Sequence, residues 1–456
     1  MRQAYQTQPK LRESWLDLDH ARELKTISDL LDLQPRISEL ILRDLRAASG
    51  GTRARTGAGG MAAEQVLRAL LIKQMNGFSF RELAFHLADS RTYRTFCRLG
   101  IAETTPSKST LAANIKALRA ETLEQVHRLI LSIAEATGVE KGRKVRVDCT
   151  VVETDIHPPT DSWLLWDCVR VLTRLMGQAR ELLGGDEIVF HRRTRRAKKR
   201  YRAIGQARRK ARRLRAYRDL IRVTEEVSGW AQHNVRVLEE AGTGDAPQAS
   251  AAQALGIQLA HFLALTERVL DQTRRRVLLG ESVPAPEKLV SIFEDHTDIV
   301  RKRSQETLYG HKICLTGGSS SMILDCVVLK GNPADSTLAQ QMIERQGEIY
   351  ERPPRQAVFD GGFASRANLS AIKSNGVQDV AFAKRAQLAI SDMVSSTWVY
   401  KRLRNFRAGI EGNISFLKRI FGLDRCAWRS SPSFRSYVWS SILSFNLLVL
   451  ARHLLV

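Results

Sequence analysis

Proline, glycine-rich repeats and paired cysteines are scarce in this chain of 456 residues. With 12 prolines and 29 glycines, the composition excludes a collagen-like or other low-complexity protein. The six cysteines form no Cys-x-x-Cys pair, so neither a zinc ribbon nor a thioredoxin-like site is indicated, and we expect reduced thiols in a cytosol. A hydrophobic fraction of 43% can form a core without disulfides, and the length predicts two to four domains.

Signatures of ATP-driven and serine-hydrolase chemistry are also missing. The chain has no GxxxxGK[ST] loop and no G-x-S-x-G elbow. Its N-terminus, MRQAYQTQPKLRESW, has no apolar stretch of the kind found in signal peptides. The most apolar segment, 439–456, is interrupted by Asn446, Arg452 and His453, which favours a buried terminal helix over a membrane span. We therefore expect no membrane partner.

Positive charge is abundant. The chain has 71 Lys and Arg against 48 Asp and Glu, a formal net charge of +23. This balance favours nucleic acid as partner, ahead of an anionic membrane surface or a merely basic soluble enzyme. The segment 192–222 holds sixteen basic residues and one acid, Asp219, so it carries +15 of the total. It is either a solvated face or, as we favour, a helix that lies along nucleic acid, with these candidate contacts: Arg208, Arg209, Arg212 and Arg213.

The first third of the chain is predicted to be helical. Apolar periodicity indicates helices near 20–31 and 36–47, a basic glycine-rich linker at 49–60, and further helices to about residue 120. The segment TTPSKSTLAANIKAL resembles the second helix of a helix-turn-helix, whose N-terminus would offer Lys108 and Ser109 to DNA. The alternative is an ordinary capped helix in an all-helical subdomain.

Strands begin after this region. In RKVRVDCTVVETDI (143–156) valines and Cys149 alternate with polar residues, which predicts a strand with Asp148 on one face. A helical block follows at 161–285. Beyond about residue 290, predicted strands alternate with helices, which is an α/β pattern interrupted by a basic helical insertion.

Three carboxylates stand out by their context. Asp148 lies within a strand, Asp360 precedes Gly361-Gly362, and Glu411 lies in an amphipathic helix predicted at about 408–421. Singly, each can be an ordinary surface or turn residue. Jointly they need a reason, because Asp is disfavoured in strands and the adjacent glycines permit close approach. Hard oxygen ligands suit Mg²⁺ or Mn²⁺, and two such ions can drive phosphodiester cleavage.

Four segments resemble the DDE transposases of bacterial insertion sequences, the ISNCY group most closely. They are VDCTVVET, YGHKICLTGG…VVLKGNPADSTL, AVFDGGFASRANLSAIKSNGV and RAGIEGNISFLKR. In the family's Tyr-(2)-Arg-(3)-Glu-(6)-Lys pattern, Arg407, Glu411 and Lys418 are in register, whereas Arg404 stands at the tyrosine position. Phe363 likewise stands where the family often has tyrosine.

The resemblance implies an α/β fold: an RNase H-like mixed sheet with flanking helices, joined to an N-terminal all-helical DNA-binding region and the basic helical insertion. It implies that Asp148, Asp360 and Glu411 bind two Mg²⁺ ions, with Mn²⁺ possible in their place. Arg407 and Lys418 would contact phosphates near the scissile bond; the alternative for them is a surface ion pair with Glu411. The expected domains are an arm and linker, a helix-turn-helix-like domain, the catalytic core in two segments, the insertion and a C-terminal helix: 1–60, 61–140, 141–160 with 290–430, 161–289 and 431–456.

A transposase of this kind would bind the terminal inverted repeats of its element, cut them, and join the 3′-OH ends to target DNA. Bringing two ends together implies at least a homodimer, in bacterial cytoplasm at the nucleoid. A non-enzymatic DNA-binding protein of the same fold is one alternative, although it would gain nothing from carboxylates beside DNA. A metal-dependent nuclease without strand transfer is the other.

Overall fold

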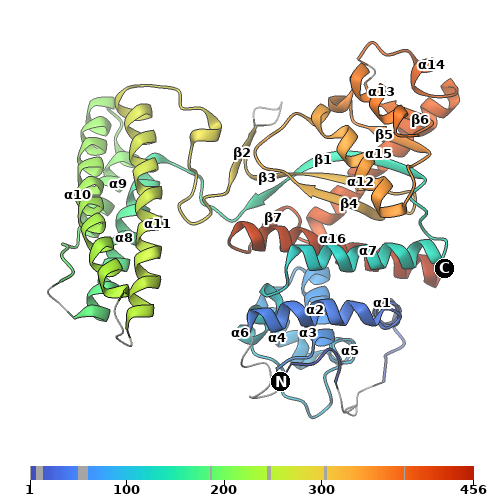
Figure 1. The fold of residues 1–456 in the computed structure, drawn as a ribbon, viewed down its shortest axis with the longest axis horizontal. Coiled ribbons are helices and arrows are strands. Elements are labelled where there is room, and N and C mark those ends of the chain that lie inside the picture. The colour runs from blue at the N-terminus through green and yellow to red at the C-terminus, as the bar shows by residue number, and fades with distance from the viewer. Residues whose placement is uncertain are drawn as a thin grey trace. The chain divides into compact units, whose positions relative to one another are not determined.

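The computed structural model describes residues 2–6, 14–49, 60–184, 187–243, 248–301, 306–384 and 386–456, and nearly all of the linker expected at 49–60 lies outside them. The chain divides into two compact units (Figure 1). One unit comprises Met1–Asp155 and Gly310–Val456, and the other is the continuous segment Ile156–Tyr309. The insertion expected at 161–289 lies within the second unit.

The N-terminal part of the first unit is helical, as predicted. Ser79 caps one helix by accepting from the backbone N–H of Glu82, whose carboxylate accepts from Ser79 in return, and Ser107 caps another. The two helices expected near 20–31 and 36–47 are confirmed, and a short helix follows Ser90 within the region expected to be helical. The helices are α1 (Asp19–Asp32), α2 (Pro35–Ala48), α3 (Ala63–Asn76), α4 (Phe80–Asp89), α5 (Arg91–Phe96), α6 (Lys108–Lys116) and α7 (Ala120–Ala136).

A mixed sheet forms the rest of the first unit, with β1 (Lys144–Thr154) near its centre. β1 runs antiparallel to β3 and parallel to β5, and β5 runs parallel to β6. β4 pairs antiparallel with β3, and β7 pairs parallel with the last residues of β1. This mixed α/β arrangement is consistent with an RNase H-like core. The remaining strands are β3 (Thr307–Gly317), β4 (Ile323–Val328), β5 (Gln356–Phe359), β6 (Asp379–Phe382) and β7 (Arg425–Cys426).

Helices connect and cover these strands. The longest of the connections, α15, starts at a Ser396 cap, well before the residue 408 that the sequence indicated. Position 409, inside this helix, requires a glycine because the guanidinium of Arg146 occupies the space where a Cβ would stand. The helices are α12 (Ala339–Tyr350), α13 (Arg366–Ser374), α14 (Ile390–Met393), α15 (Thr397–Ile420) and α16 (Ser431–Leu455).

The C-terminal helix α16 is buried, as predicted. By length and composition it could cross a membrane, but 72% of its most apolar window is covered by the protein. It packs against α1, α3, α7 and β4. Its Asn446 side chain satisfies the N–H and C=O of Ile323 in the neighbouring strand. These contacts make α16 the helix that joins the N-terminal helices to the sheet.

Removing a large side chain from α16 should therefore destabilise the first unit. Phe445 is 2% exposed, and its ring lies 5.7 Å from that of Phe421 and 6.0 Å from that of Phe416. We expect Phe445→Ala to lower the free energy of unfolding in urea by about 3–5 kcal/mol, the usual cost of such a cavity. Leu455→Ala, at an exposed position of the same helix, is the control and should change it by less than about 0.5 kcal/mol. Equal effects would contradict the buried helix.

The second unit is a helical bundle with an apolar core of its own. The bundle packs α8, α9, α10 and α11 against one another. A short π-helical turn (Arg274–Leu278) and β2 (Asp298–Arg301) follow them. The bundle helices are α8 (Asp161–Leu183), α9 (Thr194–Gln206), α10 (Lys210–Gly242) and α11 (Ala249–Thr273).

The expectation that the basic segment 192–222 is a single helix is wrong. The segment breaks at Ala207–Arg209 and belongs to two helices, α9 and the first part of α10. Its charge is also partly balanced within the bundle: Arg196 and Arg200 both pair with Asp219, and Arg193 pairs with Glu226 at 2.7 Å. Splitting the run places buried residues of both helices in the core and leaves most of the charge at the surface.

Candidate active site

Two strands and a helix bring the three predicted carboxylates together. The parallel pairing of β1 with β5 ends at Val147 opposite Phe359. Asp148 therefore continues β1 beside Asp360, which follows β5 directly. Helix α15 packs against both strands and contributes Glu411. Residues separated by 212 and 51 positions in the chain thus meet at one edge of the sheet.

The guanidinium of Arg407 lies among the three carboxylates. Its Nη2 atom is 3.2 Å from Asp148 Oδ2 and 3.0 Å from Asp360 Oδ1, and its Nη1 atom is 2.9 Å from Glu411 Oε1. Because one nitrogen touches both aspartates, their oxygens are within two hydrogen-bond lengths of each other. The ion pair with Glu411 exists, but Arg407 is only 17% exposed and joins all three acids, so it is more than a surface pair.

Burial distinguishes Asp148 from its two partners. Its side chain is 15% exposed, against 41% for Asp360 and 61% for Glu411. The pKa of Asp148 is raised from 3.8 to about 6, mainly by burial and to a smaller extent by the nearby Asp360 and Glu411, although Arg407 and the backbone N–H of Cys149 act in the opposite direction. The ionised form of Asp148 is therefore disfavoured in the folded protein, because burial outweighs the positive charge of Arg407.

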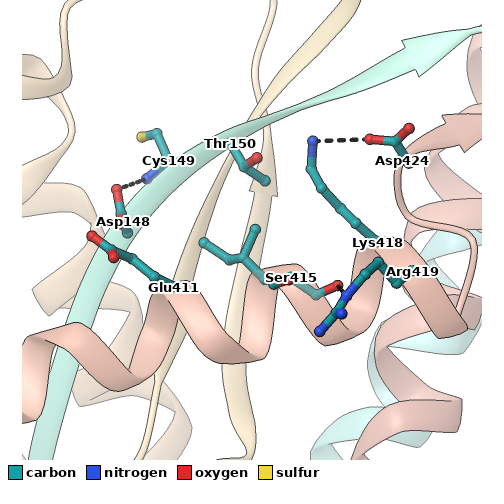
Figure 2. Close-up of a pocket in the computed structure, with 9 residues that line it drawn as sticks. Asp148, Cys149, Thr150, Glu411, Ser415, Lys418, Arg419 and Asp424 are labelled. Atoms are coloured by element: carbon teal, nitrogen blue, oxygen red, sulfur yellow. Dashed lines mark hydrogen bonds and ion pairs between the residues drawn. The ribbon is translucent and has the colours of Figure 1, made fainter.

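A pocket of about 540 Å³ opens beside Asp148 and Glu411. Figure 2 shows these two carboxylates close together, with Lys418 and Arg419 further along α15, the helix that carries Glu411. Lys418 Nζ lies 3.3 Å from Asp424 Oδ1, so this lysine pairs with Asp424. The pocket thus has Asp148 and Glu411 at one end and Lys418 and Arg419 with Asp424 at the other, and the two cations suit a phosphodiester placed along α15.

The donor set fits a divalent metal in kind. Carboxylate oxygens are the ligands that Mg²⁺ and Mn²⁺ prefer, and a dication would stabilise the ionised form of Asp148, which burial disfavours. In the part of the chain that is described, however, no three His, Cys, Asp or Glu side chains lie close enough together to ligate one ion as they stand. Arg407 holds the centre of the cluster, so its side chain must turn away before all three acids can share an ion.

The raised pKa of Asp148 should affect the free energy of unfolding in a way that depends on pH. An acid whose pKa is raised on folding destabilises the folded state above the raised pKa, and this effect disappears below the ordinary pKa. Without divalent ions, Asp148→Asn should therefore raise the free energy of unfolding at pH 7 by up to about 3 kcal/mol, since one pKa unit is about 1.4 kcal/mol. Below pH 3.8 the two proteins should be equally stable in urea. A variant that is less stable at pH 7 would contradict this account.

The segments around the acids support their placement. Lys312 Nζ, from the YGHK segment, lies 2.6 Å from Asp335 Oδ1, from the NPADS segment. Asp335 in turn packs over Gly362, where a Cβ would stand 2.6 Å from its Oδ2. Gly362, two residues after Asp360, is thus needed for the close approach of Asp335, in line with the close approach that the sequence suggested for these glycines. At Gly412, beside Glu411, a Cβ would meet nothing within 4 Å.

The candidate DNA contacts of the N-terminal region lie on the first turn of α6. Lys108 and Ser109 are exposed there. The hydroxyl of Ser107 accepts from the N–H of Thr110, and Pro106 precedes it, so the predicted start of this helix is confirmed. The helix packs against α3 and α4. The first turn of α6 therefore faces solvent with short polar and basic groups.

The candidate contacts in the insertion lie at the junction of α9 and α10. Arg208 and Arg209 are in the break between the helices, and Arg212 and Arg213 are in the first turn of α10; all four are exposed. Arg213 donates to the carbonyl of Ala207 and so satisfies the end of α9. The structure thus gathers these arginines at one corner of the bundle.

Comparison with known families agrees with this architecture. Residues 295–447 match the Transposase DDE domain, a stretch that includes Asp360 and Glu411, and residues 12–117 match the Transposase domain (DUF772). No curated protein and no solved structure matches the chain. The mixed α/β core with its converging carboxylates is consistent with a Transposase DDE domain. The chain therefore carries a Transposase DDE domain and, N-terminal to it, a Transposase domain (DUF772).

Sequence reasoning missed two features of the site. Arg407 was expected at DNA phosphates, but its contact with all three acids was not foreseen, because an (i, i+4) spacing with Glu411 indicates only one of its three partners. Arg146 was not singled out at all. It donates to the carbonyl of Phe406 at 2.9 Å and so holds α15 against β1. Two sequence features could have indicated its role: Arg146 is a basic residue inside a predicted strand, and Gly409 is a glycine inside a predicted helix.

Proposed function

We propose that this chain is the transposase of a bacterial insertion sequence of the ISNCY group. It binds the ends of its element, cuts the DNA by two-metal phosphodiester hydrolysis, and joins the 3′-OH ends to target DNA. The observation that carries the proposal is the meeting of Asp148, Asp360 and Glu411 around one guanidinium within a chain that carries a DDE transposase domain. We propose these three as the catalytic, metal-binding residues.

Each side chain then has a role that follows from its position. Asp148, Asp360 and Glu411 would hold two Mg²⁺ or Mn²⁺ ions, which activate the attacking oxygen and stabilise the leaving one when bound. Arg407, once turned from the acids, reaches the phosphate nearest to them. Lys418 lies two helical turns from Glu411 and would leave Asp424 to bind the next phosphate along α15. The half-covered cluster keeps these groups oriented before DNA arrives.

Binding of the element ends is assigned to the basic regions. The first turn of α6, with Lys108 and Ser109, has the exposed polar groups that a helix in the major groove requires. The corner formed by Arg208, Arg209, Arg212 and Arg213 would follow the phosphate backbone, which carries no sequence information. Because two ends must be held together, we propose a homodimer or larger assembly that acts at the bacterial nucleoid, in the cytoplasm.

One experiment separates this function from its two alternatives. The full chain is incubated with Mg²⁺, labelled element ends and a plasmid target. Joined products are expected; nicks alone would favour a nuclease without strand transfer, and binding without cleavage would favour a non-enzymatic DNA-binding protein. Ends with a scrambled repeat serve as the control substrate. The inverted repeats that border the reading frame supply the sequence to be tested.

A further inference from the structure

Three large aromatic side chains meet at the start of α8 and along α9. Trp163 and Trp166 come from the first turns of α8, and Tyr201 comes from α9. The ring centroids of Trp163 and Tyr201 are 5.1 Å apart, and those of Trp163 and Trp166 are 5.3 Å apart, both with rings at nearly right angles. Trp166 and Tyr201 are stacked at 5.6 Å. We call these three residues the aromatic cluster.

The aromatic cluster is not part of the bundle's core. Trp166 packs against that core, but among the described residues neither Trp163 nor Tyr201 belongs to it or packs against it. All three rings are half-buried. Single exposed apolar residues are ordinary, whereas several large rings that leave their faces partly open are typical of a binding site.

The cluster is held in a fixed orientation. The side chain of Trp163 hydrogen-bonds to Asp167, which also pairs with Arg170 at 2.7 Å. On the other side, the His157 ring lies 5.0 Å from that of Trp163. A ring that is already oriented loses little entropy when a flat ligand stacks on it.

Positive charge surrounds the cluster. The ammonium of Lys198 lies 5.8 Å from the centre of the Trp166 ring, and the guanidinium of Arg170 lies 5.3 Å from it. Lys199 and Arg202, on the same helix as Tyr201, are exposed. These residues belong to or adjoin the segment that carries +15 of the chain's +23. Aromatic faces interleaved with cations bind single-stranded nucleic acids, because the cations take the phosphates and the rings take the bases.

We propose that the aromatic cluster is a stacking site for unpaired bases of single-stranded DNA. A duplex keeps its bases stacked on one another and offers the protein only phosphates and groove edges, for which arginines suffice. Half-buried rings can stack with bases that have left the duplex, and stacking is worth about 1–3 kcal/mol per base. The choice of DNA rests on the function proposed above; the stacking chemistry does not.

Variants of the full chain test the site. The probe is an oligothymidylate with one 2-aminopurine, whose fluorescence falls when the base is stacked, and a duplex element end is measured in parallel. Trp163→Ala and Tyr201→Ala should each weaken binding of the single strand by about tenfold and remove the fluorescence change, since 1.4 kcal/mol is tenfold. Affinity for the duplex should stay within about twofold.

Variants that keep an aromatic ring show whether the loss of the ring causes the loss of single-strand binding. Trp163→Phe and Tyr201→Phe keep a ring and should retain single-strand binding, although Trp163→Phe loses the hydrogen bond with Asp167. The proposal is overturned if the alanine variants bind the single strand as the unmodified chain does. It is also overturned if they lose affinity for single strand and duplex equally, which would make the cluster structural. Failure of the unmodified chain to bind duplex ends would instead contradict the proposed transposase function.

Discussion

Asp360→Asn should abolish DNA cleavage while leaving the binding of element ends nearly unchanged. Asparagine keeps the size of the side chain but removes a charged ligand from the three that would hold the metal ions. Metal ions contribute several kcal/mol to the stabilisation of the transition state, so the rate should fall by at least about a thousandfold. Binding should persist because phosphate contacts elsewhere supply most of the affinity. Cleavage of labelled ends and a gel-shift titration measure the two effects.

The control for this variant is Asp392→Asn, which changes an exposed aspartate of α14 by the same atoms. It should cleave at the unmodified rate. Because Arg407 also contacts Asp148 and Glu411, the loss of one partner should not unfold the site. Cleavage by Asp360→Asn at near the unmodified rate would show that the three acids are not the catalytic centre.

The alternation of apolar and polar residues was sufficient to predict β1 and to single out Asp148. A period-2 pattern depends on local geometry alone, and Val145, Val147 and Val151 are buried as it requires. The N-terminal helices were predicted from their apolar periodicity, which is also local, and the burial of α16 was predicted from the polar residues that interrupt its apolar stretch. Asp360 and Glu411 were singled out by the glycines beside them, but the resemblance to a family was needed to give them a catalytic role, because neither a turn nor an amphipathic helix distinguishes a catalytic acid from a surface one.

What the sequence could not provide depends on contacts between distant segments. The reason for Gly409 inside α15 was not visible, because it is a guanidinium that arrives from β1. The break in the basic segment was missed because Arg208 and Arg209 carry no helix-stop signal. The two-residue strand β7 is defined only by its pairing with Glu153 and Thr154 of β1.

Neutralising the corner of the insertion should weaken DNA binding and flatten its dependence on salt. We expect the triple variant Arg208→Gln, Arg209→Gln and Arg212→Gln to lower the slope of log K against log[salt] by up to about 3, since each phosphate that is no longer neutralised lowers it by about one. At low salt the affinity should fall by about a hundredfold, if each arginine contributes about 1 kcal/mol. Fluorescence anisotropy with a labelled duplex, over a series of salt concentrations, gives both quantities. These arginines are exposed, so the bundle should remain folded.

A second triple variant in the same segment distinguishes local contacts from total charge. Arg193→Gln, Arg196→Gln and Arg200→Gln also remove three positive charges, but these arginines already pair with Glu226 or Asp219. Because their charge is partly balanced within the protein, they release fewer counterions from DNA, and the salt slope should change by less than half as much. Equal slopes for the two variants would mean that the segment acts through net charge alone. An unchanged slope in the first variant would mean that the corner at Arg208–Arg212 is a solvated face.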